Sequence, residues 1–133
     1  MDQVTEIPSS ARALLDQPLI GVLATVRPDG SPQGNPMWFA FDEEAGTLLF
    51  THTTQRAKFR NLAANPAMSF CLLDPQDGYR YAEFRGRLVD TTPDPDIAFY
   101  QQLQDRYGVE RYRSADAPDR VVLTMSIDKV VAA

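Results

Sequence analysis

The sequence is poor in the residues that build metal sites and covalent cross-links. It has one cysteine, Cys71, and one histidine, His52. A single cysteine excludes an internal disulfide and any multi-cysteine metal site, and one histidine excludes a His-rich metal centre within one subunit. The nucleophile elbow, the Walker-type glycine loop and the dinucleotide fingerprint are also missing. If the protein is an enzyme, a bound cofactor must supply the difficult chemistry.

Long hydrophobic runs and an excess of basic residues are missing too. No apolar run approaches the roughly 20 residues of a membrane helix. The first six residues are acidic and lack the segments of a signal peptide, so we expect a cytoplasmic protein with no membrane contact. A net charge of −5 argues against nucleic-acid binding, which needs a basic face. We expect residues 1–133 to form a single domain, since 133 residues are enough to bury one core.

Short strands separated by turn residues dominate the rest of the pattern. We expect six strands, over 19–26, 33–41, 47–52, 68–73, 79–89 and 121–127, the first three as an antiparallel meander. We expect a capped helix of about two turns that follows Ser9 and Ser10, begins at Ala11 and stops before Pro18. We expect two further helices, over 55–64 and from Thr92 to about Tyr107. Six short strands with few helices indicate a mainly β protein that closes into a small antiparallel barrel.

The segment from Thr51 to Leu62 predicts an anion site. A hydroxyl-rich strand end runs into a helix start, where Arg56, Lys58 and Arg60 follow within five residues. Unpaired backbone N–H groups and the helix dipole attract phosphates at such a position. No Asp or Glu occurs between residues 44 and 74. The alternative is a solvated helix whose cations pair with distant carboxylates, with Phe59, Leu62 and Ala63 as its buried stripe.

Three other features have two readings each. Met37 and Trp38 fit either core packing or a flat apolar wall beside an aromatic ligand. Tyr79, at a strand start, is a candidate for a pocket rim. His52 has no second histidine with which to share a metal, so a hydrogen-bonding role is favoured.

Taken in order, these segments resemble the pyridoxamine-phosphate-oxidase-like split β-barrels, and within them the B-type reductases that use the deazaflavin coenzyme F420. The matching segments are 20–25, 28–33, 41–42, 56–62, 65–67 and 77–79, and the similarity runs from about residue 14 to residue 131. The resemblance implies a six-stranded antiparallel Greek-key split barrel of the FMN-binding type, with short flanking helices.

The resemblance also implies a homodimer with a cofactor site at each end of the interface. Arg56, Lys58 and Asn61 would hold the phosphate and ribityl region, while Gln33, Thr51 and His52 would contact the tail and the ring system. Met37 and Trp38 would lie near the ring, and Tyr79 would approach from the partner subunit. Arg60 would add a cation for the carboxylates of the F420 tail.

The function that the resemblance implies is an F420H2-dependent reductase that transfers a hydride to an unsaturated or conjugated small molecule. No side chain is expected to be a required catalytic acid or base. Two alternatives remain open at this point. One is an FMN-dependent oxidase or reductase on the same barrel, and the other is a non-catalytic protein that binds and carries F420.

Overall fold

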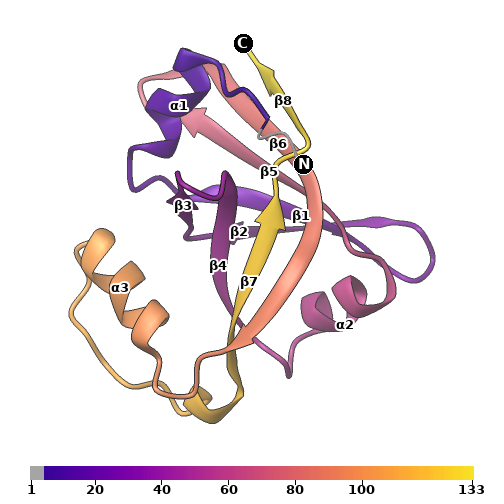
Figure 1. Ribbon diagram of the computed structural model, residues 1–133, viewed down its shortest axis with the longest axis vertical. Helices are drawn as coiled ribbons and strands as arrows, with labels where there is room; N and C mark the ends of the chain where they lie inside the picture. The colour runs from indigo at the N-terminus through magenta and orange to yellow at the C-terminus, as the bar shows by residue number, and fades with distance from the viewer. Residues whose placement is uncertain (1–4) are drawn as a thin grey trace.

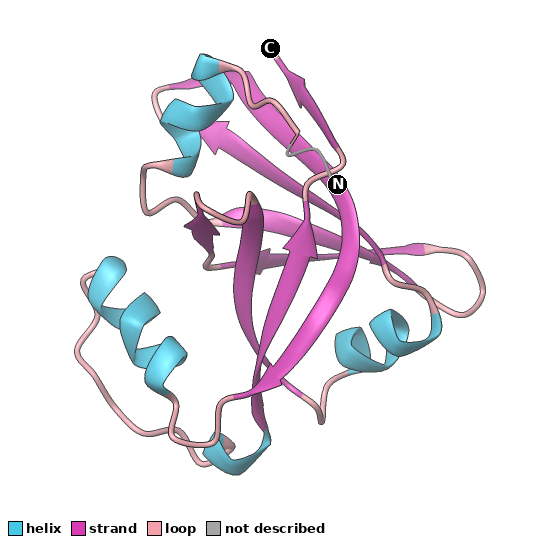
Figure 2. Cartoon of the chain, in the orientation of Figure 1, coloured by secondary structure: helices cyan, strands magenta, loops and turns pink. Residues whose placement is uncertain are grey.

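The computed structural model describes residues 5–133, which form an antiparallel β structure with short helices around it (Figures 1 and 2). The strands of the described chain are β1 (Gly21–Val26), β2 (Pro32–Met37), β3 (Ala40–Asp42), β4 (Thr47–Thr53), β5 (Ala67–Asp74), β6 (Asp77–Pro93), β7 (Arg120–Ser126) and β8 (Lys129–Ala132). The helices are α1 (Ser9–Leu15), α2 (Ala57–Ala64), α3 (Ala98–Arg106) and the 3-10 turn η1 (Ala117–Asp119).

One long strand joins the two parts of the sheet. The strand order is β2-β1-β5-β6-β7-β4-β3, and β8 pairs with the first half of β6. The N-terminal half of β6 pairs with β5 and its C-terminal half pairs with β7. At the changeover lies Gly86, where an added Cβ would stand 1.8 Å from the carbonyl oxygen of Ser126. Only glycine allows the two strands to approach so closely. The architecture is the predicted split β-barrel.

The single strand predicted over 33–41 is wrong in its pairing. β2 pairs with β1, whereas β3 pairs with β4 in the other part of the sheet. The chain crosses between them at Trp38 and Phe39, and Phe39 is fully buried. The first three predicted strands therefore do not form a meander. This division, together with β8, gives eight strands in residues 5–133 where six were expected.

Two helix starts also differ from the prediction. Pro8, not a serine, is the N-cap residue of α1, and no side chain caps that helix. The helix expected from Thr92 begins at Ala98, because β6 continues through Pro93 in register with Val121 of β7. Asp94 then accepts hydrogen bonds from the Phe99 and Tyr100 backbone N–H groups at 3.4 and 3.3 Å. The pairing of β6 with β7 overrides the local helix signal.

The core lies between the two parts of the sheet and under α1 and α2. Phe39, Phe50 and Phe70 are fully buried and meet edge to face, with ring centroids 5.0–5.2 Å apart. Interlocked aromatic rings of this kind make a rigid support for the strand ends. No helix within residues 5–133 is long and apolar enough to cross a membrane.

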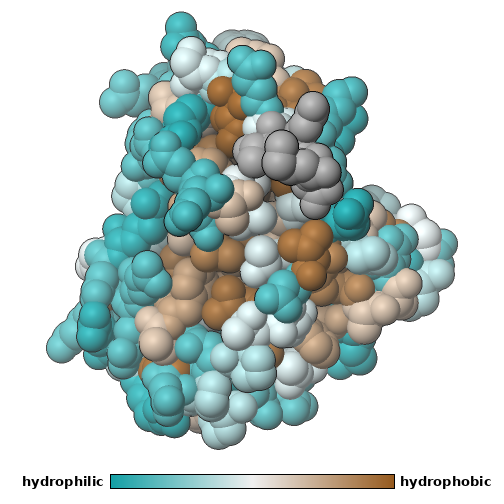
Figure 3. Space-filling model, in the orientation of Figure 1, coloured by the Kyte–Doolittle hydropathy of each residue, from teal (hydrophilic) through white to brown (hydrophobic). Residues whose placement is uncertain are grey.

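Hydrophobic side chains also reach the surface. Figure 3 shows them gathered over β4, β7 and the middle of β6, inside a polar frame. Elsewhere Ile20, Val22 and Leu73 are at least half exposed. A sheet with apolar side chains on an open face is suited to covering by another protein surface.

Candidate cofactor site

A cavity of about 470 Å³ lies where the ends of β2 and β4 meet the start of α2 and the chain around α3. Its walls are formed by Asn35, Pro36, Met37, Trp38, Thr51, His52, Arg56, Lys58, Tyr100, Tyr112 and Arg120. A smaller cavity of about 290 Å³ continues it along Gln33, Asn35, His52, Arg56, Ala57 and Lys58. The cavity walls in the described chain hold three cations and no carboxylate.

The start of α2 supplies the cations. Arg56 is the N-cap residue, with extended backbone, and Lys58 is the second helical residue. The expected buried stripe was partly wrong: Lys58, Asn61 and Leu62 are buried, whereas Ala63 is exposed. The helix is therefore rotated so that a lysine and an amide, rather than alanine, face the barrel. A solvated cationic helix is excluded for Lys58, which is only 4% exposed.

Lys58 lies in an environment that disfavours its charge. Burial, and secondarily the nearby Arg56, lower its pKa from 10.5 to about 8. Its ammonium donates a hydrogen bond to the sulfur of Met37 at 3.1 Å, and a thioether is a weak acceptor. A buried ammonium without a carboxylate partner is costly, and an anion in the cavity would relieve that cost.

The end of β4 places two polar side chains beside these cations. His52 is 4% exposed, and burial together with Lys58, Arg56 and Arg120 lowers its pKa from 6.5 to about 3. Its imidazole is therefore neutral at physiological pH. Within residues 5–133, neither its Nε2 atom nor the Thr51 hydroxyl has a hydrogen-bond partner. Buried polar atoms of this kind are usually satisfied, so these two are available to a bound molecule.

A row of hydrogen-bonded side-chain amides continues the polar lining of the cavities. The Asn61 side chain donates to the Gln33 carbonyl oxygen at 2.7 Å, and Gln33 donates to Asn35 at 3.1 Å. α2 and β2 are thereby connected across the smaller cavity. The resulting row of amides fixes Gln33 at the cavity wall, where it can offer a hydrogen bond to a polar ligand.

Trp38 gives the cavity a flat apolar wall residue. It stacks on Tyr107 with ring centroids 4.8 Å apart and planes 9° from parallel. The Tyr107 hydroxyl donates to the Leu19 carbonyl at 2.6 Å and accepts from the Phe39 N–H at 3.1 Å. The crossover from β2 to β3 is thus held by one tyrosine, which also fixes the indole plane.

Most of the predicted site residues come together here. Seven line the two cavities: Gln33, Met37, Trp38, Thr51, His52, Arg56 and Lys58. Asn61 reaches them through its hydrogen bond to Gln33. Arg60 does not line either cavity; it is exposed and donates to the Gln55 carbonyl at 3.3 Å. Tyr79 is 91% exposed at the start of β6 and contributes to neither cavity.

Five wall residues of the larger cavity were not expected: Asn35, Pro36, Tyr100, Tyr112 and Arg120. The last three come from α3, the loop after it and the first residue of β7. The polar loop before the closing strand carried a signal, since Tyr112 is an aromatic residue in an otherwise charged stretch. Arg120 lies opposite Thr53 of β4, a register that sequence alone does not give.

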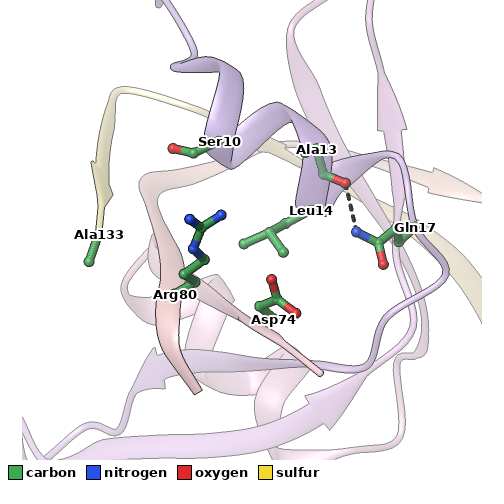
Figure 4. A pocket seen from close by; sticks show the side chains of 7 residues that line it. All are labelled: Ser10, Ala13, Leu14, Gln17, Asp74, Arg80 and Ala133. Atoms are coloured by element: carbon green, nitrogen blue, oxygen red, sulfur yellow. Dashed lines mark hydrogen bonds between the residues drawn. The ribbon is translucent and has the colours of Figure 1, made fainter. Parts of the chain in front are cut away.

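A separate cavity of about 290 Å³ opens between α1 and the β5–β6 turn (Figure 4). Arg80 and Asp74 extend from the turn toward α1, and Ala133 lies on the other side of Arg80. Its lining combines the cation of Arg80 and the carboxylate of Asp74 with uncharged side chains. This cavity lacks the excess positive charge of the larger cavity at the start of α2, called the α2 cavity below.

The residues of the α2 cavity fit a planar, anionic cofactor. Arg56 and Lys58 can bind a phosphate at the helix start, and the free His52 and Thr51 atoms can bind ring oxygen or nitrogen. Trp38 supplies an apolar surface against which a planar ring can lie. An antiparallel split barrel with this cavity at the strand ends defines the class of the protein, a split β-barrel built to hold a cofactor of this kind.

Comparison with known proteins gives the family. Residues 7–132 match the family model described as pyridoxamine 5'-phosphate oxidase, and the chain belongs to that family. The solved structure of an F420 reductase is 48% identical, covers 94% of this chain and 98% of its own, and superposes with a TM-score of 0.89.

More distant structures show the same fold. General stress protein 26 of Bacillus anthracis is 21% identical, with coverage of 92% and 90% and a TM-score of 0.70. A conserved hypothetical protein of Mycobacterium tuberculosis is 20% identical, with coverage of 96% and 89% and a TM-score of 0.72.

Proposed function

We propose that the protein is a reductase that uses coenzyme F420 to reduce an unsaturated or conjugated small molecule. The observation that carries the proposal is Lys58, a buried cation beside Arg56 in a cavity without acids. Such a site favours an anionic ligand. The 48% identity to an F420 reductase over nearly the whole chain supports F420 as that ligand.

The roles of the side chains follow from their places in the cavity. Arg56 and Lys58 would bind the phosphate, and Gln33, oriented by Asn61, would bind the polar chain next to it. His52 and Thr51 would hydrogen-bond to the ring system, and Met37 and Trp38 would hold its plane. Bound F420H2 supplies the hydride. The protein contributes orientation and exclusion of water, because no wall residue is placed as an obligatory acid or base.

A homodimer is part of the proposal. The exposed apolar residues of β1 and β5 and the apolar face seen in Figure 3 are suited to covering by a second copy. In a dimer, the exposed Tyr79 ring would be available to the partner's cavity. The two residues that the single chain leaves away from the site, Tyr79 and Arg60, would then contact the ring and the carboxylate tail of F420.

The experiment is a turnover assay with chemically reduced F420 and a panel of enones and quinones, followed by the return of F420 absorbance. We expect acceptor-dependent oxidation, and much slower oxidation with the Arg56→Gln variant at limiting F420H2. Tight binding of F420 with no turnover of any acceptor would instead support a carrier protein. A protein that purifies with bound FMN and turns over with it would assign the site to the flavin branch.

A further inference from the structure

The end of the large cavity away from the smaller one carries two tyrosines, which line the large cavity alone. The hydroxyls of Tyr100, on α3, and Tyr112, in the loop after it, are 2.7 Å apart. Their rings meet nearly at right angles, with centroids 6.0 Å apart. Tyr100 is 8% exposed, whereas Tyr112 is 54% exposed. The pair therefore joins a fixed, buried phenol to one that reaches the cavity and solvent.

The tyrosine pair has one proton to donate to a ligand, whichever of the two hydroxyls donates to the other. Burial, and then the hydrogen bond with Tyr112, raise the pKa of Tyr100 to about 12, so its hydroxyl stays protonated. Two hydroxyls carry two protons, and the hydrogen bond between them uses one. The other proton is left for a ligand. A ligand oxygen at this end would receive a hydrogen bond from Tyr112, whose hydroxyl is in turn held by the buried Tyr100 hydroxyl on α3.

Arg120 does not make this end an anion site. Its guanidinium carbon lies 4.5 Å above the Tyr100 ring, and its Nε donates to the Asp116 carboxylate at 3.1 Å. A hydrogen bond from Ser114, and secondarily the charge of Arg120, lower the pKa of Asp116, which is therefore ionised. The two charges balance each other. The tyrosine end is thus close to neutral, in contrast to the end formed by Arg56 and Lys58.

The shape of the cavity limits the ligand further. Trp38 and Pro36 also line the large cavity, and the Trp38 plane is fixed by its stack on Tyr107. A flat ligand fits such a wall better than a bulky one. We infer that the Tyr100–Tyr112 pair forms the acceptor subsite and binds a neutral, planar, conjugated carbonyl compound through its oxygen. This inference rests on the proposed function, since it supplies the acceptor of that reaction.

Trp38 provides a direct measurement, because it is the single tryptophan of the chain and lines the cavity. Three ligands with one skeleton separate the possibilities: benzalacetone, which has a neutral carbonyl, cinnamate, which has a carboxylate, and the corresponding alkene without oxygen. Binding to the F420-free protein is followed by Trp38 fluorescence and confirmed by calorimetry. We expect benzalacetone to bind about fivefold to tenfold more tightly than the alkene, the scale of one hydrogen bond.

The variants test the hydroxyls. In Tyr112→Phe we expect benzalacetone affinity to fall to that of the alkene, while the affinity for the alkene and for F420 stays unchanged. Tyr100→Phe should cause a smaller loss, because Tyr112 keeps its own proton. Tyr81→Phe, on β6 and outside the cavity walls, is the matched control and should bind as wild type. Circular dichroism confirms that each variant is folded.

Two results would overturn the inference: full benzalacetone affinity in both folded tyrosine variants, or tighter binding of cinnamate than of benzalacetone. The second result would make Arg120 an anion-binding residue. Failure of the proposed function looks different. In that case the wild-type protein would bind no F420, whatever the three small ligands do at the tyrosine end.

Discussion

At the scale of single residues, Lys58 is the clearest sign of function, because it harms the stability of the free protein. Its pKa falls from 10.5 in the unfolded chain to about 8 in the folded one. Between these values the unfolded chain binds more protons, so the free energy of unfolding should rise with pH across that window. Below pH 8 the penalty is fully present. Such a cost is typical of binding sites, where residues serve a ligand rather than the fold.

We therefore predict that Lys58→Met stabilises the free protein by about 1–3 kcal/mol at pH 7. The methionine side chain has a volume similar to that of lysine, and the substitution removes the buried charge. The same variant should bind F420 at least tenfold more weakly. Urea unfolding and a fluorescence titration measure the two effects. Lys129→Met is the control, because Lys129 is exposed on β8, and its unfolding free energy should move by less than about 0.5 kcal/mol. A Lys58 variant that is less stable and still binds F420 would contradict this role.

A second prediction concerns the pKa of His52, whose NMR signals can be assigned directly because the chain has one histidine. Its pKa is lowered to about 3 in the folded state against 6.5 in the unfolded chain. Between these values only the unfolded chain takes up the proton, so stability should be lost as the pH falls from 6.5 toward 3. In NMR titration the imidazole should stay neutral in the folded protein down to about pH 4. A midpoint near 6.5 would show that the side chain is solvated and does not face the cations.

At the scale of elements, the crossover from β2 to β3 deserves a test because it holds the cavity wall. We predict that Tyr107→Phe lowers the free energy of unfolding by about 1–3 kcal/mol, since the Leu19 carbonyl and the Phe39 N–H both lose their partner. Chemical denaturation measures the loss. Tyr79→Phe removes a hydroxyl with no partner among the described residues, on a side chain that is 91% exposed in the single chain, and should unfold as wild type does. Equal effects in both variants would mean that the crossover is held by packing alone.

The elements that sequence predicted well are those with a strong local pattern. Strand β5 and helix α2 were placed within two residues at each end, because a proline and an alternating apolar pattern bound them. The crossing at Trp38 could not be seen, since the apolar run around it reads as one strand. The helix expected from Thr92 failed because the pairing of β6 with β7 is a long-range effect.

In the candidate site too, residues that are adjacent in sequence were predicted, and residues brought together only by the fold were missed. The cations of α2 and the end of β4 were expected because they are adjacent in sequence. The tyrosine end was missed because Tyr100, Tyr112 and Arg120 reach the cavity only through the fold of α3 and the loop before β7. The burial of Lys58 was also unexpected, because helical position alone placed it beside the apolar stripe and not within it.

At the scale of the whole molecule, charge is distributed unevenly. The chain carries a net charge of −5, yet Arg56 and Lys58 meet at one cavity at the strand ends. A local positive field in an acidic protein favours one small anion over polyanions such as nucleic acid. The rigid aromatic core behind the strand ends holds the cations in place before the ligand arrives, which lowers the cost of binding.

The most direct test of this account is a fluorescence titration of the wild-type protein with F420 beside FMN, at pH 7 and again at pH 9. We predict micromolar or tighter binding of F420, weaker binding of FMN, and a loss of F420 affinity at the higher pH. The loss is expected because the free protein gives up the Lys58 proton at about pH 8, and the phosphate then meets a neutral amine. Preference for FMN, or binding of neither molecule, would contradict the proposed F420 site.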